Sequence, residues 1–104
     1  MADYYDIYIT ARDEAEARRI GETLVAERLA ACANIQPIRS IYRWQGKMEE
    51  ASEAALLLKT RADLVNQAIA RVKALHSYEV PCIVATPIER GNPAYLEWIN
   101  ESTR

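Results

Sequence analysis

The sequence predicts an α+β fold in which a β-α-β unit occurs twice, so that one antiparallel sheet carries both helices on one of its faces. Three observations favour this fold. Extended and helical patterns alternate along the 104 residues in the order β-α-β-β-α-β-α. Half of the residues are hydrophobic and 27% are charged, as in globular domains. A chain of this length usually forms one core, so residues 1–104 are expected to be a single domain.

The first strand and the first helix follow from hydrophobic periodicity. Residues Tyr4 to Thr10 are rich in β-branched and aromatic side chains that alternate in polarity, which predicts a strand. Asp13 followed by Glu16 is a helix-capping pattern, and the helix is expected to run from about 13 to 29. Its core-facing stripe is predicted to comprise Ala17, Ile20, Leu24 and Arg28.

Two long extended segments predict a hairpin. Cys32 to Trp44 contains Pro37, which lacks an amide donor and marks a bulge or an edge strand. Gln45-Gly46 offers a tight turn, and Lys47 to Thr60 returns as the second strand. A strand of about 13 residues spans roughly 43 Å, whereas a domain of about 100 residues has a radius of gyration near 13 Å. The hairpin is therefore expected to overhang its own core.

The second half of the chain repeats the pattern. Residues Thr60 to Asp63 look like a capping signal for a helix that ends near His76. Val80 to Thr86 predicts a short strand, and Asn92-Pro93 begins a short C-terminal helix. The whole order corresponds to a ferredoxin-like arrangement, in which the first and last strands are antiparallel neighbours.

An overhanging hairpin needs a cover. It carries Tyr42, Trp44 and Met48, which would leave apolar surface and strand edges exposed in a monomer. We therefore expect a symmetric homo-oligomer in which another copy of the chain covers these residues.

Composition and charge exclude several classes of partner. The formal net charge is -2, so no overall positive field attracts nucleic acid. Apolar runs such as Ala54 to Leu58 are far shorter than the about 20 residues of a membrane span, so no direct membrane insertion is expected. The acidic start MADYYDIYIT is unlike a secretory signal, which predicts a cytoplasmic protein with Cys32 and Cys82 as free thiols.

The single histidine marks a candidate metal site. His76, Glu79 and Cys82 combine an imidazole, a carboxylate and a thiol, a donor set suited to copper or zinc. The end of the first strand, near Thr10, should approach Cys82, whereas Cys32 should lie at the other end of the sheet. Two simpler interpretations stay open: His76 could interact with the last carbonyls of its helix, and either cysteine could act as a small hydrophobic residue.

Three further residues are candidate ligand-binding groups. Trp44 and Tyr78, together with Tyr42, either fill a contact between subunits or line a ligand pocket. Lys59 ends an apolar strand, where it could pair with a carboxylate such as Glu79 in a neighbouring copy or bind an anionic ligand. Neither a phosphate-binding loop nor a zinc-protease motif is present, so we expect no organic cofactor and no enzymatic activity.

Five blocks of sequence together resemble the CutA family, the divalent-cation tolerance proteins. They are ERLAACANI (27–35), SIYRWQGK (40–47), LLLKT (56–60), ALHSYEVP (74–81) and GNPAYLEWI (91–99). The resemblance implies a ferredoxin-like subunit, a tight homotrimer, a cytoplasmic location, tolerance of copper and other divalent metals, and a shape like that of the trimeric PII signalling proteins. Some members have a Cys where this chain has Ile9 and a second His where it has Leu75. Those positions are associated with copper, so two ligands that the resemblance implies are absent.

Two functions remain open from the sequence. The first is a trimeric, cytoplasmic metal-response protein that binds copper or a related divalent cation without turnover. The second is a PII-like signalling or adaptor protein, in which clefts between subunits hold a small molecule or a partner loop and metal effects are indirect.

Overall fold

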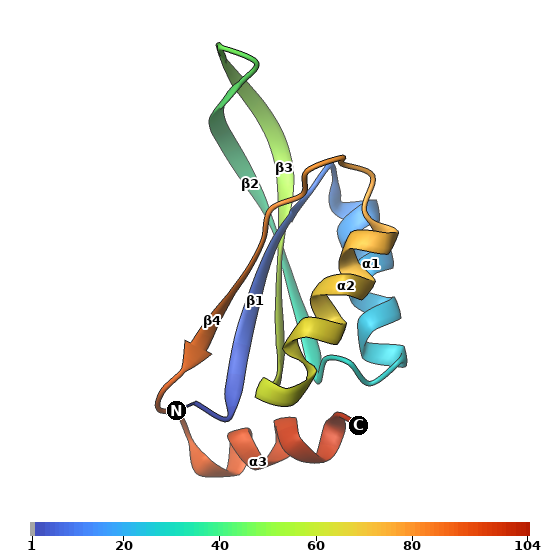
Figure 1. Ribbon diagram of the computed structural model, residues 1–104, viewed down its shortest axis with the longest axis vertical. Helices are drawn as coiled ribbons and strands as arrows, with labels where there is room; N and C mark the ends of the chain where they lie inside the picture. Colours follow the sequence, from blue (N-terminus) through green and yellow to red (C-terminus); the bar gives the residue numbers. More distant parts are fainter. Residues whose placement is uncertain (1) are drawn as a thin grey trace.

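The computed structural model describes residues 2–104 and has the predicted order of elements (Figure 1). The predicted domain also includes Met1, which lies outside the described residues. The elements are β1 (Tyr4–Ala11), α1 (Glu14–Ala26), β2 (Cys32–Trp44), β3 (Lys47–Arg61), the 3-10 turn η1 (Ala62–Leu64), α2 (Val65–Leu75), β4 (Ile83–Ile88) and α3 (Pro93–Ser102). The predicted α+β class is confirmed.

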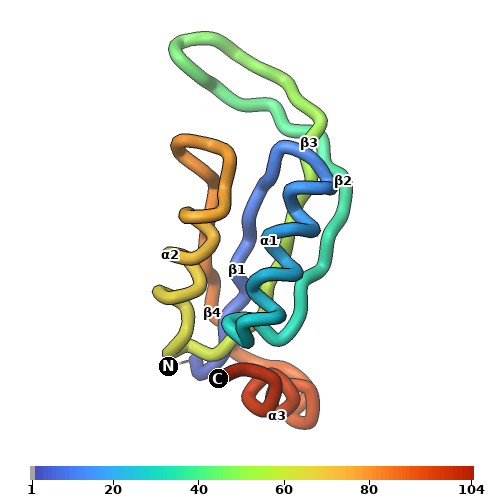
Figure 2. Tube along the Cα trace, turned by 90° about the vertical axis from the view of Figure 1, so that its right-hand side faces the viewer, coloured from blue at the N-terminus to red at the C-terminus, as the bar shows by residue number. Residues whose placement is uncertain are grey.

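A four-stranded antiparallel sheet in the order β2-β3-β1-β4 organises the chain. β1 is bonded to β3 on one side and to β4 on the other, as predicted for the first and last strands. Helices α1 and α2 lie on one face of this sheet, and α3 crosses its lower end (Figures 1 and 2). None of the three helices in the described part of the chain has the length and hydrophobicity of a membrane span.

The hydrophobic core lies between the sheet and the two helices. Ile7 and Ile9 of β1 are fully buried and face their neighbours Leu58 and Leu56 on β3. Burying a Leu or Ile side chain contributes about 1.5–3 kcal/mol, so each of these four residues stabilises the contact between β1 and β3 by about that amount. The helices add Ala17, Ile20, Leu24, Ala68 and Val72.

The first helix is shorter than predicted, and Arg28 is the reason. The helix ends at Ala26, because Arg28 adopts a left-handed backbone conformation with φ 59°. Its guanidinium then donates hydrogen bonds to the carbonyls of Glu101 and Thr103 at the end of α3. The prediction that Arg28 belongs to the core-facing stripe of the helix is therefore wrong.

Two boundaries in the second half also differ. Thr60 does not cap a helix: it is buried in β3, which continues to Arg61, and its hydroxyl donates to the Leu29 carbonyl at 2.7 Å. The last strand begins at Ile83 rather than at Val80, whose side chain is 71% exposed. Residues 76–82 instead form a loop between α2 and β4, held by side-chain hydrogen bonds that no local pattern reveals.

The hairpin overhangs the body, as predicted. The molecule measures 44 × 25 × 22 Å, and β2 pairs with β3 without interruption from Cys32↔Lys59 to Trp44↔Lys47. Pro37 is part of this regular pairing on an edge strand, so the edge interpretation holds and the bulge does not. The pairing of β1 with β3 ends at Ala11 and Ala54. Beyond Ala54 the hairpin has no β1 neighbour, and it curves over the α2–β4 loop (Figure 2).

The turn at the hairpin tip gives the first prediction. Gln45 and Gly46 both have positive φ, 51° and 80°, as a two-residue hairpin turn requires. Gly46→Ala should cost about 1–2 kcal/mol locally, because L-residues resist this conformation although a Cβ there meets no atom within 4 Å. Gln45→Asn should have the opposite effect, since Asn tolerates positive φ. Amide hydrogen exchange at the tip should accelerate in the first variant and slow in the second; equal exchange in both would contradict this account.

Candidate functional site

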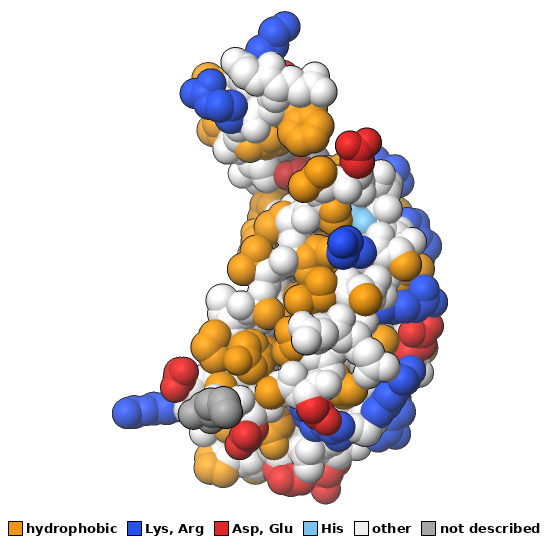
Figure 3. Space-filling model, viewed as in Figure 1, with side chains coloured by type: hydrophobic (Ala, Val, Ile, Leu, Met, Phe, Trp, Pro, Cys, Tyr) orange, Lys and Arg blue, Asp and Glu red, His pale blue; other side chains and the backbone are white. Residues whose placement is uncertain are grey.

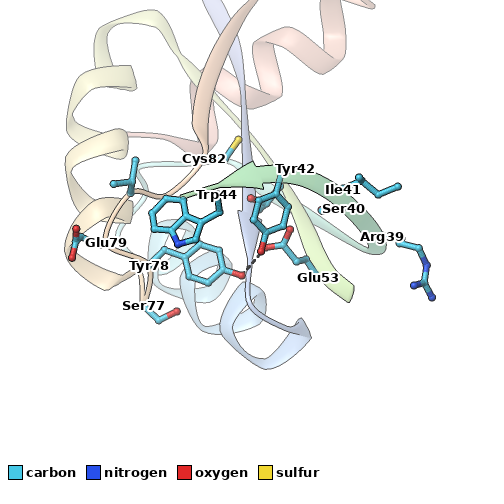
Figure 4. A pocket seen from close by; sticks show the side chains of 12 residues that line it. Arg39, Ser40, Ile41, Tyr42, Trp44, Glu53, Ser77, Tyr78, Glu79 and Cys82 are labelled. Atoms are coloured by element: carbon cyan, nitrogen blue, oxygen red, sulfur yellow. Dashed lines mark hydrogen bonds between the residues drawn. The ribbon is translucent and has the colours of Figure 1, made fainter. Parts of the chain in front are cut away.

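A cavity lies beneath the overhang of the hairpin. It has a volume of about 820 Å³ and is bounded by β2 and β3, the end of β1 and the α2–β4 loop. Tyr42, Trp44 and Tyr78 point their rings toward it, and Glu53 lies among them (Figure 4). A volume of this size is within the range of small-molecule sites.

Strand geometry explains why these side chains meet. Successive side chains of a strand alternate between the two faces, so Tyr42 and Trp44 share one face of β2. The β2–β3 register pairs Ile38, on that same face, with Glu53, which places Glu53 beside the two rings. Arg39 is on the alternate face and pairs with Glu50 at 3.0 Å, although part of it reaches the cavity.

Tyr78 comes from the α2–β4 loop and closes the cavity from the other side. Its hydroxyl donates a hydrogen bond of 2.6 Å to Glu53 Oε2 (Figure 4). Burial raises the pKa of Tyr78, and the hydrogen bond to the carboxylate of Glu53 raises it further. The phenol therefore stays protonated and works as a hydrogen-bond donor that joins the loop to the hairpin.

His76 holds the same loop against β1. Tyr78 N–H donates to Nδ1 of His76 at 3.0 Å, which leaves the ring proton on Nε2. Nε2 then donates to the carbonyl of Thr10 at 2.8 Å. The imidazole is thus a bridge in which both nitrogens are used, and it does not bond to the last carbonyls of α2.

Glu16 anchors the neighbouring residue of the loop. Its side chain is fully buried and accepts hydrogen bonds of 2.8 Å from the backbone amides of Ser77 and Arg12. Burial alone would raise the pKa of Glu16, but the hydrogen bonds from Ser77 and Arg12 outweigh it and hold the pKa below its ordinary 4.5. An ionised carboxylate therefore joins the start of α1 to the α2–β4 loop.

The three candidate metal ligands all belong to the α2–β4 loop but are not assembled as a donor set. In residues 2–104 no group of three or more His, Cys, Asp or Glu side chains is arranged to hold a metal ion. Glu79 and Cys82 are exposed and line the cavity, while both nitrogens of His76 are occupied. The Thr10 amide bonds to the Cys82 carbonyl at 3.4 Å, so the predicted approach of β1 to Cys82 is confirmed.

Lys59 lies away from the cavity, at the opposite end of the sheet. It forms a 2.8 Å ion pair with Asp6 of the same chain, a partner that the sequence analysis missed. Cys32 pairs with Lys59 across β2 and β3, and its sulfur lies 3.5 Å from the Tyr95 hydroxyl on α3. Of the three predicted ligand-binding residues, Trp44 and Tyr78 therefore share one cavity and Lys59 does not.

The fold and this cavity define a small α+β protein with a protruding hairpin and an aromatic-lined pocket at its base. The model of the CutA1 divalent ion tolerance protein family matches residues 6–102. The chain therefore belongs to the CutA1 divalent ion tolerance protein family.

Individual relatives agree with this assignment. The divalent-cation tolerance protein CutA of Thermus thermophilus is 52% identical over 98 residues, covering 93% of this chain and 95% of the relative. The solved structure of CutA from Xylella fastidiosa has a TM-score of 0.96 at 46% identity and covers 99% and 100% of the two chains. That of the periplasmic divalent cation tolerance protein CutA from Archaeoglobus fulgidus has a TM-score of 0.93 at 48% identity and covers 95% and 97%.

Ile9 and Leu75, the two positions that the sequence comparison with the family singled out, are part of the core in this chain. Ile9 is fully buried, and Leu75 packs against the core cluster. Both positions therefore contribute apolar packing in this chain.

Glu16 gives a prediction with a defined pH dependence. Because its pKa is lowered in the folded state, its stabilisation is present above the unfolded value near 4.5 and is lost as the pH falls through the folded pKa. Glu16→Gln should cost about 1–3 kcal/mol near neutral pH, since the two amides lose a charged acceptor. Urea unfolding at several pH values should show a smaller acid-induced loss in the variant. A loss equal to that of the wild type would contradict the role of Glu16.

Proposed function

We propose that this chain works in divalent-cation tolerance as a PII-like homotrimer of ferredoxin-like, single-domain subunits, in which the pocket receives a small molecule or a partner loop without turnover. The observation that carries the proposal is the contrast between two sites. The pocket beneath the hairpin is lined by aromatic rings, whereas His76 is committed to hydrogen bonds within the chain. Metal effects are then indirect.

Exposed apolar surface supports the trimer. The sheet face opposite the helices presents Tyr8, 39% exposed, and Val84, 51% exposed, which are cross-strand partners. On the hairpin Met48 is 78% exposed. Figure 3 shows apolar side chains gathered over β4 and β1 and on the hairpin. Exposed apolar surface of this kind is costly in water unless another chain covers it.

Direct binding of copper or a related divalent cation is the second candidate. It is favoured by the position of Glu79 and Cys82, which line the same pocket as the aromatic residues. For His76 to join them, one of its two hydrogen bonds must break, or a neighbouring subunit must supply the missing donor.

A cytoplasmic location is part of the proposal. Cys32 and Cys82 are both free thiols, as is usual in reducing compartments. The Archaeoglobus fulgidus relative, in contrast, is described as periplasmic.

The trimer gives a prediction with a matched control. Sedimentation of the wild type at micromolar concentration should give three times the 11.8 kDa mass of the chain. Val84→Glu should shift the mass toward the monomer, because it puts a charge into the covered face. Val25→Glu makes the same change at a 37% exposed position on α1 and should leave the mass unaltered. A monomeric wild type would overturn the proposal.

Copper titration separates the two candidates. Calorimetry with Cu(II), and with Cu(I) under anaerobic conditions, compares the wild type with a His76 variant. We expect no saturable copper binding that is present in the wild type and absent in the variant. The matched variant His76→Ala should bind as the wild type does and should unfold at a lower temperature, because the bridge from Thr10 to Tyr78 is lost. Binding near one ion per subunit that disappears in the variant would instead establish the metal site.

A further inference from the structure

We propose that the pocket beneath the hairpin selects organic cations, that is, small molecules carrying an ammonium or guanidinium group. This inference rests on the proposed function, because it names the ligand class of the same pocket. It is carried by the aromatic rings, by the position of one carboxylate and by the charges around that carboxylate.

The aromatic rings supply the first part of the recognition. Tyr42 and Trp44 are 43% and 49% exposed, and both rings turn toward the cavity together with that of Tyr78 (Figure 4). The face of an aromatic ring attracts a cation within about 6 Å of its centroid. Three rings from two different segments can therefore surround one cationic group.

The carboxylate of Glu53 supplies the second part. It is half-buried among the rings and is oriented by the 2.6 Å hydrogen bond from Tyr78. No Lys, Arg or His side chain of residues 2–104 lies within 4.0 Å of it as an ion-pair partner. The hydrogen bond from Tyr78 does not neutralise the carboxylate. Glu53 therefore presents an uncompensated negative charge to the pocket.

The other charges at the pocket have the same sign or are already compensated. Glu79 lines the cavity and also forms no ion pair within the described residues. Arg39 is the one basic residue among the lining residues, and Glu50 compensates its charge at 3.0 Å. Anionic ligands would therefore meet two carboxylates, whereas an organic cation would meet a complementary site.

Choline and its uncharged carbon analogue dimethylbutanol test the proposal on the intact protein. The two molecules have nearly the same shape and differ in charge. The indole N–H signals of Trp44 and Trp98 report binding by NMR. Trp98 lies on α3 with its ring centroid 5.3 Å from that of Tyr95, and it is the internal control. Choline should shift the Trp44 signal saturably and leave Trp98 unchanged. Dimethylbutanol should bind about tenfold more weakly.

Charge variants identify the anchor. Glu53→Gln should weaken choline binding about tenfold while leaving dimethylbutanol unaffected. Glu22→Gln removes the same charge from an exposed position on α1 that does not line the pocket, and it should leave choline binding unchanged. Tyr78→Phe keeps the ring but removes the hydrogen bond that orients Glu53, so choline should still bind, though less tightly than to the wild type.

The possible failures are distinguishable. Equal binding of choline and dimethylbutanol by a protein of trimer mass would overturn the cation preference and leave the ligand pocket of the proposed function intact. No shift of Trp44 with either molecule would overturn the cation site, and a trimer mass in the same sample would leave the proposed function standing. Selective binding of choline by a monomer would support the cation site and overturn the trimer.

Discussion

The mismatch in strand length is the constraint on which the rest of the structure depends. β2 and β3 contain 13 and 15 residues, whereas β1 and β4 contain 8 and 6. The two short strands and the helices build a complete core, so the surplus length of the hairpin has to leave the body. From this follow the exposed apolar residues on the overhang, the bare sheet face that continues into it, and the pocket at its base.

Much of the fold could be predicted from the sequence because it depends on local patterns. The alternation in β1, the capping by Asp13 and Asn92 and the turn at Gly46 are all properties of neighbouring residues. The errors occurred where distant contacts decide. Arg28 leaves the helix to bind carbonyls of residues 101 and 103, and Thr60 bonds to Leu29 rather than to a helix. No neighbouring residue signals either contact.

The pocket shows the same limit. Trp44 and Tyr78 could be singled out as aromatic residues near turns, but Glu53 could not, because its role depends on a register that pairs β2 with β3 and on a hydrogen bond from a loop 25 residues away. His76 attracted attention as the single histidine. Its function in the structure is set by the Thr10 carbonyl, 66 residues away, and by the Tyr78 amide. An imidazole that bridges two backbone groups stabilises the pocket wall, whatever the pocket binds.

The central claim is that another copy of the chain covers the bare sheet face and the free strand edge of the overhang, while the pocket beneath the hairpin stays open to a ligand. Residue-resolved hydrogen–deuterium exchange on the intact wild-type protein tests it most directly. The outward amides of the edge strand β4 and those of the hairpin beyond Ala54 should exchange as slowly as amides of the central strand β1, because a neighbouring subunit shields them. Rapid exchange of both segments, with β1 still protected, would show that these surfaces face water and would contradict the account.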